Sequence, residues 1–177
     1  MITEAVISVK ANMKLVIEDL RSDDWEQVKK IYLEGIATGQ ATFETEAPSW
    51  EAWDASHLAC ARFVARGEDA IRGWAALSPV SKRRAYTGVA EVSIYVAREH
   101  RKSGIGRALL EQLIAESEQQ GLWTLQAVVF PENEATLALH RSCGFREVGR
   151  REKIAQLNGV WRDTILLERR SSIIGVN

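Results

Sequence analysis

The fold is decided by residues 89–106, which read VAEVSIYVAREHRKSGIG. The first eight are mostly apolar or β-branched, which is typical of a β-strand. After the glycines, apolar residues recur every three or four positions from Ile105 to Ile114, so an amphipathic helix is predicted to run toward Gly121. The connection between strand and helix carries two glycines among basic residues, and it is the first candidate for a binding site.

This connection has the chemistry of an anion cradle. The first backbone N–H groups of a helix have no partner inside the helix, and the helix dipole adds positive potential there. Gly104 and Gly106 remove side chains where a ligand would approach, and Arg101, Lys102 and Arg107 add charge. The pattern predicts a diphosphate at the helix N-terminus. The simpler alternative is that both glycines serve only capping and packing. Neither a Walker motif nor the dinucleotide motif GxGxxG is present.

Outward from this stretch, the pattern predicts a single α/β domain over residues 13–170, with an extension over 1–12 and a tail over 171–177. A mixed sheet with helices on both faces is expected. Further strands are predicted over residues 14–20, 61–65, 71–77, 124–130, 145–148 and 160–167, and further helices from Trp25 toward Gly39, over 50–58 and over 133–142.

Composition excludes several classes of protein. The chain of 177 residues has a net charge of −1, which offers no broad attraction for nucleic acid or an anionic membrane. No apolar run reaches the ~18 residues that a transmembrane helix needs, and residues 1–12 do not resemble a secretion signal. Cys60 and Cys143 have neither disulfide-framework nor zinc-ligand spacing. A cytoplasmic enzyme without a metal is expected.

Two blocks of the sequence resemble the GNAT N-acetyltransferase superfamily. The first is Arg101-x-x-Gly104-x-Gly106, and the second is residues 133–145, NEATLALHRSCGF. The resemblance implies a single-domain GNAT fold with a mixed, mostly antiparallel central sheet flanked by helices. It also implies acetyl-CoA as cosubstrate and a homodimer. The cofactor-binding residues that it implies are Ile94, Val96, Arg101, Lys102, Ser103, Gly104, Ile105, Gly106, Arg107, Asn133 and His140.

Finer details are similar to the phosphinothricin acetyltransferase branch of this superfamily. They are the segments 42–44 (TFE), 84–86 (RAY) and 161–163 (WRD). The resemblance implies that the acceptor is the free amine of a small amino-acid analogue such as phosphinothricin, methionine sulfoximine or methionine sulfone. Phe43, Arg84, Tyr86 and Glu91 are the expected acceptor contacts. A guanidinium suits the carboxylate or phosphinate of such a molecule, although a solvated basic loop is the simpler interpretation of Arg84.

Glu91 and His140 are the candidate catalytic residues. Glu91 is the one acidic residue in its strand. An α-amino group is largely protonated near neutral pH, so attack on a thioester requires a base, which a carboxylate can supply. An outward-facing glutamate is the alternative. His140 stands where many GNAT enzymes have a tyrosine thought to protonate the departing thiolate; it could donate a proton, contact substrate or simply pack in its helix. Cys143 has no evident activating base, so direct transfer without an acetyl-enzyme is expected.

Two competing functions fit the same sequence. An enzyme of the same fold could acetylate protein N-termini or another amine, such as a polyamine. A non-enzymatic CoA-binding sensor is the other alternative, and the presence of Glu91 argues against it.

Overall fold

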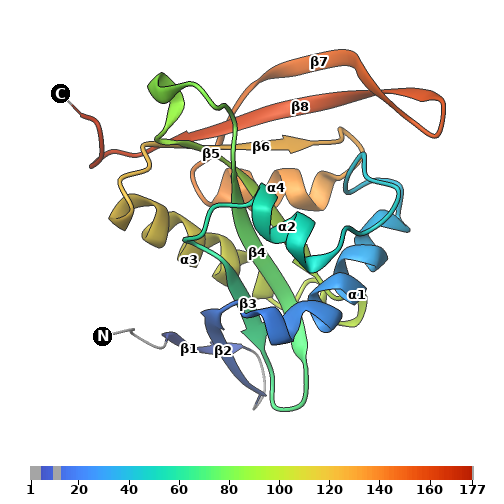
Figure 1. The fold of residues 1–177 in the computed structure, drawn as a ribbon, viewed down its shortest axis with the longest axis vertical. Helices are drawn as coiled ribbons and strands as arrows, with labels where there is room; N and C mark the ends of the chain where they lie inside the picture. Colours follow the sequence, from blue (N-terminus) through green and yellow to red (C-terminus); the bar gives the residue numbers. More distant parts are fainter. Residues whose placement is uncertain (1–4, 10–12, 177) are drawn as a thin grey trace.

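The computed structural model describes residues 5–9 and 13–176. It contains one sheet of eight strands in the order β1-β2-β3-β4-β5-β6-β8-β7 (Figure 1). The strands are β1 (Ala5–Val9), β2 (Met13–Asp19), β3 (Phe63–Arg66), β4 (Ile71–Pro79), β5 (Val89–Val96), β6 (Thr124–Val129), β7 (Arg146–Leu157) and β8 (Val160–Arg170). The helices are α1 (Trp25–Ile36), α2 (Trp50–Ser56), α3 (Ile105–Gln119) and α4 (Glu134–Ser142), with short 3-10 turns η1 (Ser22–Asp24), η2 (Arg84–Tyr86) and η3 (Arg98–His100).

Adjacent strands are antiparallel except β5 and β6, which are parallel. The parallel pair requires a crossover, and α3 supplies it. This arrangement confirms the predicted α/β fold class with its mixed, mostly antiparallel sheet.

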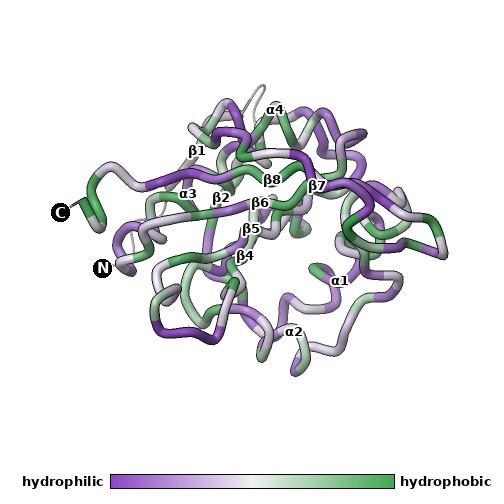
Figure 2. The backbone as a smooth tube through the Cα atoms, turned by 90° about the horizontal axis from the view of Figure 1, so that it is seen from above, coloured by the Kyte–Doolittle hydropathy of each residue, from purple (hydrophilic) through white to green (hydrophobic). Residues whose placement is uncertain are grey.

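Helices cover both faces of the sheet, and each face has its own core. Helices α1 and α2 pack on one face around Val28, Trp53 and Trp74. Helices α3 and α4 pack on the other face, where Leu109 and Leu137 belong to the second core. The view from above shows α1 and α2 on one side of the strands, with α3 and α4 on the other (Figure 2). Because neighbouring residues of a strand point to opposite faces, each residue of β5 contributes to one of these two environments.

The structure differs from the sequence prediction at the ends of the sheet. Part of the predicted extension forms β1, which pairs with β2. Strand β3 begins at Phe63 rather than at residue 61, because Ala61 has a positive φ of 54° that breaks the extended conformation. The last two strands form a longer hairpin than predicted, since β7 extends to Leu157 and pairs with β8 across two register irregularities.

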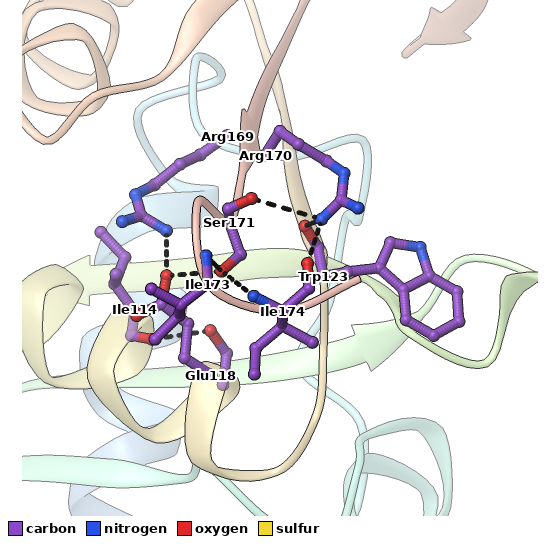
Figure 3. Close-up of polar contacts among 9 residues, drawn as sticks. Ile114, Glu118, Trp123, Arg169, Arg170, Ser171, Ile173 and Ile174 are labelled. Atoms are coloured by element: carbon purple, nitrogen blue, oxygen red, sulfur yellow. Dashed lines mark hydrogen bonds and ion pairs between the residues drawn. The ribbon is translucent and has the colours of Figure 1, made fainter. Parts of the chain in front are cut away.

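The C-terminal tail packs back on the domain through polar contacts (Figure 3). Arg170 donates hydrogen bonds to the carbonyl oxygens of Trp123 and Ile174, both at 2.7 Å. The Ser171 hydroxyl is 3.0 Å from an Oε1 of Glu118 at the end of α3. The tail therefore covers the start of β6.

No helix in the described part of the chain is both long and apolar enough to cross a membrane.

Candidate active site

The candidate site is a cleft of about 1120 Å³ that opens where β5 and β6 separate. The two strands pair over residues 89–91 and 124–126, and the last opposed pair is Glu91 and Gln126. Beyond this pair, residues 92–96 and 127–129 line the cleft from its two sides. A strand that leaves its neighbour exposes backbone N–H and C=O groups, which are then available to a ligand. Glu91 lies at the vertex of this opening.

The predicted anion cradle is at one end of the cleft. Gly104 is the N-cap of α3 and has a φ of 91°, a left-handed conformation that favours glycine. A left-handed residue followed by a helical one aims consecutive N–H groups at one point, where they can bind an anion. Arg101, Lys102 and Arg107 line the cleft with Gly104. Gly106 also lines the cleft and packs closely on α4, since an added Cβ would lie 3.3 Å from a Cδ of Leu139.

Two predicted cofactor-binding residues do not line the cleft. The Ser103 hydroxyl donates to the carbonyl oxygen of His100 within the turn. Ile105 is buried in the core between α3 and the sheet. Their side chains thus shape the turn, whereas Ile94 and Val96 are lining residues from β5.

Helix α4 forms another wall through Asn133 and His140, which both line the cleft. Asn133 is the N-cap: its Oδ1 accepts a hydrogen bond from the N–H of Thr136 at 3.2 Å, and its Nδ2 donates to the carbonyl oxygen of Gln40 at 3.1 Å. It therefore joins α4 to the loop that carries Phe43. The ring of Phe43 meets Phe130 edge to face at 4.8 Å, at the same wall.

His140 has one satisfied and one free ring nitrogen. The side chain is 1% exposed, and Nδ1 is 2.8 Å from the carbonyl oxygen of Thr136. Because a carbonyl oxygen only accepts, Nδ1 carries the proton and Nε2 has a lone pair. Nε2 is buried without a partner in the described chain. Burial lowers the pKa of His140, so the neutral ring is favoured near neutral pH. A bound molecule with an N–H or O–H group would satisfy Nε2.

Glu91 faces the side of the sheet covered by α1 and α2. Its strand neighbours Ala90 and Val92 belong to the core under α3, so alternation places Glu91 on the opposite face. Gln126 donates a hydrogen bond from Nε2 to Oε2 of Glu91 at 2.8 Å. Ser78 of β4 is the directly opposed residue on the other side and also lines the cleft.

Aromatic side chains and a second histidine also line the cleft. His57 stacks on Trp53 with the ring centres 4.2 Å apart, and its Nδ1 lies 2.7 Å from the Trp53 carbonyl oxygen. Tyr32 and Tyr95 meet edge to face at 4.9 Å, and burial raises the pKa of both hydroxyls. These residues line the cleft as neutral groups that can exchange hydrogen bonds with a ligand.

The structure does not bring Arg84 and Tyr86 into the cleft. They form η2 in the exposed loop between β4 and β5, and neither is a lining residue. Tyr86 is 45% exposed, and the guanidinium above its ring, at 5.9 Å, is that of Arg83. The loop nevertheless joins the two strand ends that carry Ser78 and Glu91.

Comparison with known proteins agrees with this geometry. Residues 17–145, most of the chain, match the acetyltransferase (GNAT) family. The chain belongs to the GNAT acetyltransferase family. It is an acetyl-CoA-dependent N-acetyltransferase, which confirms the predicted family, enzyme class and cosubstrate.

Two relatives indicate a branch of the GNAT family. A phosphinothricin N-acetyltransferase from Alcaligenes faecalis is 31% identical over 90% of this chain and 84% of its own. A methionine sulfoximine/methionine sulfone acetyltransferase from Pseudomonas aeruginosa is 31% identical over 75% of this chain and 73% of its own.

Two solved N-acetyltransferase structures have the same fold. A phosphinothricin acetyltransferase from Sinorhizobium meliloti in complex with acetyl-CoA is 28% identical, with a TM-score of 0.83 over 92% of this chain and 91% of its own. A ribosomal-protein-alanine N-acetyltransferase from Brucella melitensis is 27% identical, with a TM-score of 0.81 over 88% of this chain and 99% of its own.

Sequence reasoning misses several residues at this site, among them His57, Ser78 and Gln126. Each stands in a segment whose pattern is explained by secondary structure alone. Only the pairing of β4, β5 and β6 puts Ser78 and Gln126 on either side of Glu91. A polar residue in an otherwise apolar strand is the signal that indicates Glu91, and the same signal applies to Ser78 and Gln126.

Proposed function

We propose that the chain transfers the acetyl group of acetyl-CoA to the free amine of a small amino-acid-like acceptor, with Glu91 as general base. Phosphinothricin, methionine sulfoximine and methionine sulfone are the leading acceptors, as the names of the two relatives suggest. The observation that carries the proposal is the position of Glu91 at the vertex where β5 and β6 separate. There a carboxylate meets the cleft beside strand edges that are open to the cosubstrate.

The cosubstrate would be held by the cradle at the start of α3. The backbone N–H groups of residues 101–106 and the side chains of Arg101, Lys102 and Arg107 supply positive potential for the diphosphate. Ile94 and Val96 from β5 and Asn133 from α4 would border the rest of the molecule. The bound cosubstrate supplies the activated acetyl group.

Glu91 would take the proton that keeps the acceptor amine from attacking. Proton removal by a placed side chain typically contributes about 10²–10⁴-fold to a rate. One oxygen of Glu91 already accepts a hydrogen bond from Gln126, so the other is available for the acceptor ammonium.

His140 would act as a hydrogen-bond acceptor rather than as an acid. Its proton is on Nδ1, bonded to Thr136, and the free Nε2 offers a lone pair. An N–H or S–H group of the bound molecules fits this atom. The acid role of the tyrosine found at this point in other members is therefore not assigned to His140.

Phe43, Arg84 and Tyr86 remain the proposed contacts for the rest of the acceptor. Phe43 lines the cleft. For Arg84 and Tyr86 the support is their loop, which joins the strand ends that carry Ser78 and Glu91. Because both residues lie outside the cleft in this structure, this contact would require the loop to approach the bound acceptor, whose carboxylate a guanidinium would suit.

The function is tested by measuring thiol release from acetyl-CoA with phosphinothricin, methionine sulfoximine, methionine sulfone, common amino acids, polyamines and short peptides. We expect turnover with the amino-acid analogues. Turnover confined to peptides would instead support the protein N-terminal activity named for the Brucella melitensis structure.

The base is tested with Glu91→Gln, which we expect to lower kcat near pH 7 by about 100-fold while the KM for acetyl-CoA changes less than about twofold. Glu168→Gln is the matched control, because Glu168 faces Gln126 from the β8 side but does not line the cleft. A Glu91→Gln enzyme with the turnover and pH–rate profile of the wild type would remove Glu91 from this role.

A homodimer is also part of the proposal. Large apolar side chains are exposed along the β7–β8 hairpin: Val148, Ile154, Val160 and Trp161. Exposed apolar residues that form one patch are typical of a protein–protein interface. Their place on the last strands of the sheet supports association through that edge.

We further propose a cytoplasmic location. Cys60 and Cys143 are free thiols. Free cysteines are typical of reducing compartments, where disulfides are rare.

A further inference from the structure

A row of opposed residues crosses the sheet at the vertex of the cleft. Ser78 of β4 is paired with Glu91 of β5, and Glu91 is paired with Gln126 of β6. Directly opposed residues of neighbouring strands point to the same face, at about 4.5–5.5 Å between Cβ atoms. All three side chains therefore lie on the face covered by α1 and α2. Glu91 is the central member, with one polar neighbour on each side.

The two neighbours of Glu91 differ in what they contact. Ser78 lines the cleft, where a ligand can reach it. Gln126 is half-buried and does not line the cleft, yet its Nε2 donates to Oε2 of Glu91 at 2.8 Å. Gln126 thus contacts the carboxylate from β6 without itself lining the cleft.

This hydrogen bond limits the geometry of the carboxylate. A glutamate side chain rotates about three torsions, and the last is broad and poorly fixed by sterics alone. A hydrogen bond to an ionised acceptor is stronger than one between neutral groups. Gln126, on the neighbouring strand β6, donates its hydrogen bond to Oε2 of Glu91. Rotation of the Glu91 carboxylate that would carry Oε1 away from the cleft therefore breaks this charge-assisted hydrogen bond.

We propose that Gln126 is the positioning residue for Glu91, holding Oε2 so that Oε1 is the oxygen that takes the proton from the acceptor ammonium. This inference rests on the proposed role of Glu91 as base. In the step, an N–H bond of the ammonium breaks and its proton bonds to Oε1, and the electron pair left on nitrogen forms the new N–C bond to the acetyl carbon. The C–S bond of the thioester then breaks, its electron pair leaves with the CoA thiolate, and the second proton lost by nitrogen goes to that thiolate to give the CoA thiol. Gln126 neither gains nor loses a proton.

The test is Gln126→Met, which keeps an unbranched side chain of similar length but cannot donate a hydrogen bond. We expect kcat to fall by about tenfold or more, because misplacing a catalytic group by about 1 Å can cost 10²-fold. The KM for acetyl-CoA should stay within about twofold, since the cradle residues are untouched. Gln126→Leu, which is of similar size and also cannot donate a hydrogen bond, should show the same loss.

A double-mutant cycle with Glu91→Gln separates positioning from simple structural damage. If Gln126 acts through Glu91, the Gln126→Met change should cost less than about twofold in the Glu91→Gln background. An equal loss of kcat in both backgrounds overturns the inference, as does wild-type kcat in both Gln126 variants. Wild-type turnover in Glu91→Gln alone would instead refute the base assignment.

Gln120→Met is the matched control. Gln120 at the end of α3 makes the same kind of bond, from its Nε2 to Oε1 of Glu116, also at 2.8 Å, but it is exposed and does not line the cleft. We expect the control to leave kcat unchanged. A loss of kcat in Gln120→Met as large as that in Gln126→Met would show that the effect is not specific to Glu91, and would overturn the inference.

Discussion

At the scale of single residues, His140 and His57 are two imidazoles packed in the same manner. In each, Nδ1 lies within hydrogen-bond distance of the backbone carbonyl oxygen four residues earlier, 2.8 Å to Thr136 and 2.7 Å to Trp53. Burial is the largest influence on both and lowers both pKa values. Protonating either ring in the folded chain requires placing a charge where little water can reach it.

This burial predicts a pH dependence of stability. The unfolded chain binds the His140 proton at its ordinary pKa of 6.5, and the folded chain only at a lower pH. The stabilisation that neutral His140 contributes to the free energy of unfolding is therefore fully present above pH 6.5 and is lost as pH falls from 6.5 toward the folded pKa. For one histidine, the free energy of unfolding changes by at most about 1.4 kcal/mol per pH unit. Urea unfolding of the wild type and His140→Gln from pH 8 to 5.5 measures it. The wild type should lose more stability over this range, and equal losses would contradict the prediction.

At the scale of elements, the site depends on the N-terminus of α3 and on the separation of β5 from β6. The turn before α3 contains two residues with positive φ, Lys102 at 62° and Gly104 at 91°. Close packing fixes the helix against its neighbours: an added Cβ at Gly73 of β4 would lie 3.1 Å from a Cδ of Leu109. This packing fixes the position of the N-terminus of α3 in the wall of the cleft.

Replacing Gly104 with alanine should therefore affect both stability and the cosubstrate. A side chain in the left-handed conformation costs about 1–2 kcal/mol. Gly121→Ala at the other end of α3 is the control, since Gly121 has a φ of 77° and nothing within 4 Å of an added Cβ. We expect both variants to lose similar stability in thermal unfolding. Only Gly104→Ala should weaken acetyl-CoA binding in calorimetry, and equal affinities in the two variants would argue against the cradle.

At the scale of the whole molecule, the packing of a single chain does not explain the large apolar side chains exposed on the β7–β8 hairpin. Val160 and Trp161 are 60% and 56% exposed although both are large and apolar. The hairpin is accordingly the surface on which we expect the second copy.

The expected homodimer can be tested by light scattering after size-exclusion chromatography. We expect a mass near twice the 19.8 kDa of the chain, and we expect Trp161→Asp to shift it toward one chain. A charge buried in an apolar interface without a partner is strongly unfavourable. Ile173→Asp in the C-terminal tail, at 63% exposure, is the control that should remain dimeric. A wild-type mass of one chain would contradict the assembly.

Much of the fold could be predicted from the sequence, because the deciding signals are local. The apolar and β-branched residues over 89–96 predicted β5 with the bounds that the structure has. The apolar periodicity after Gly104 predicted α3, and the glycines with their basic neighbours predicted the cradle that lines the cleft. Each of these predictions depends on residues that are close together in the sequence, within one strand or one or two helical turns.

Only the tertiary structure decided the contacts between segments that are distant in the sequence. Gln126 is 35 residues from Glu91, and the two meet only through the register of β5 and β6. Conversely, Arg84 and Tyr86 are close to Glu91 in sequence, yet they lie in an exposed turn outside the cleft. A strand pattern fixes which residues share a face, but it cannot fix which strand pairs alongside or in which register, because those depend on the packing of the whole sheet.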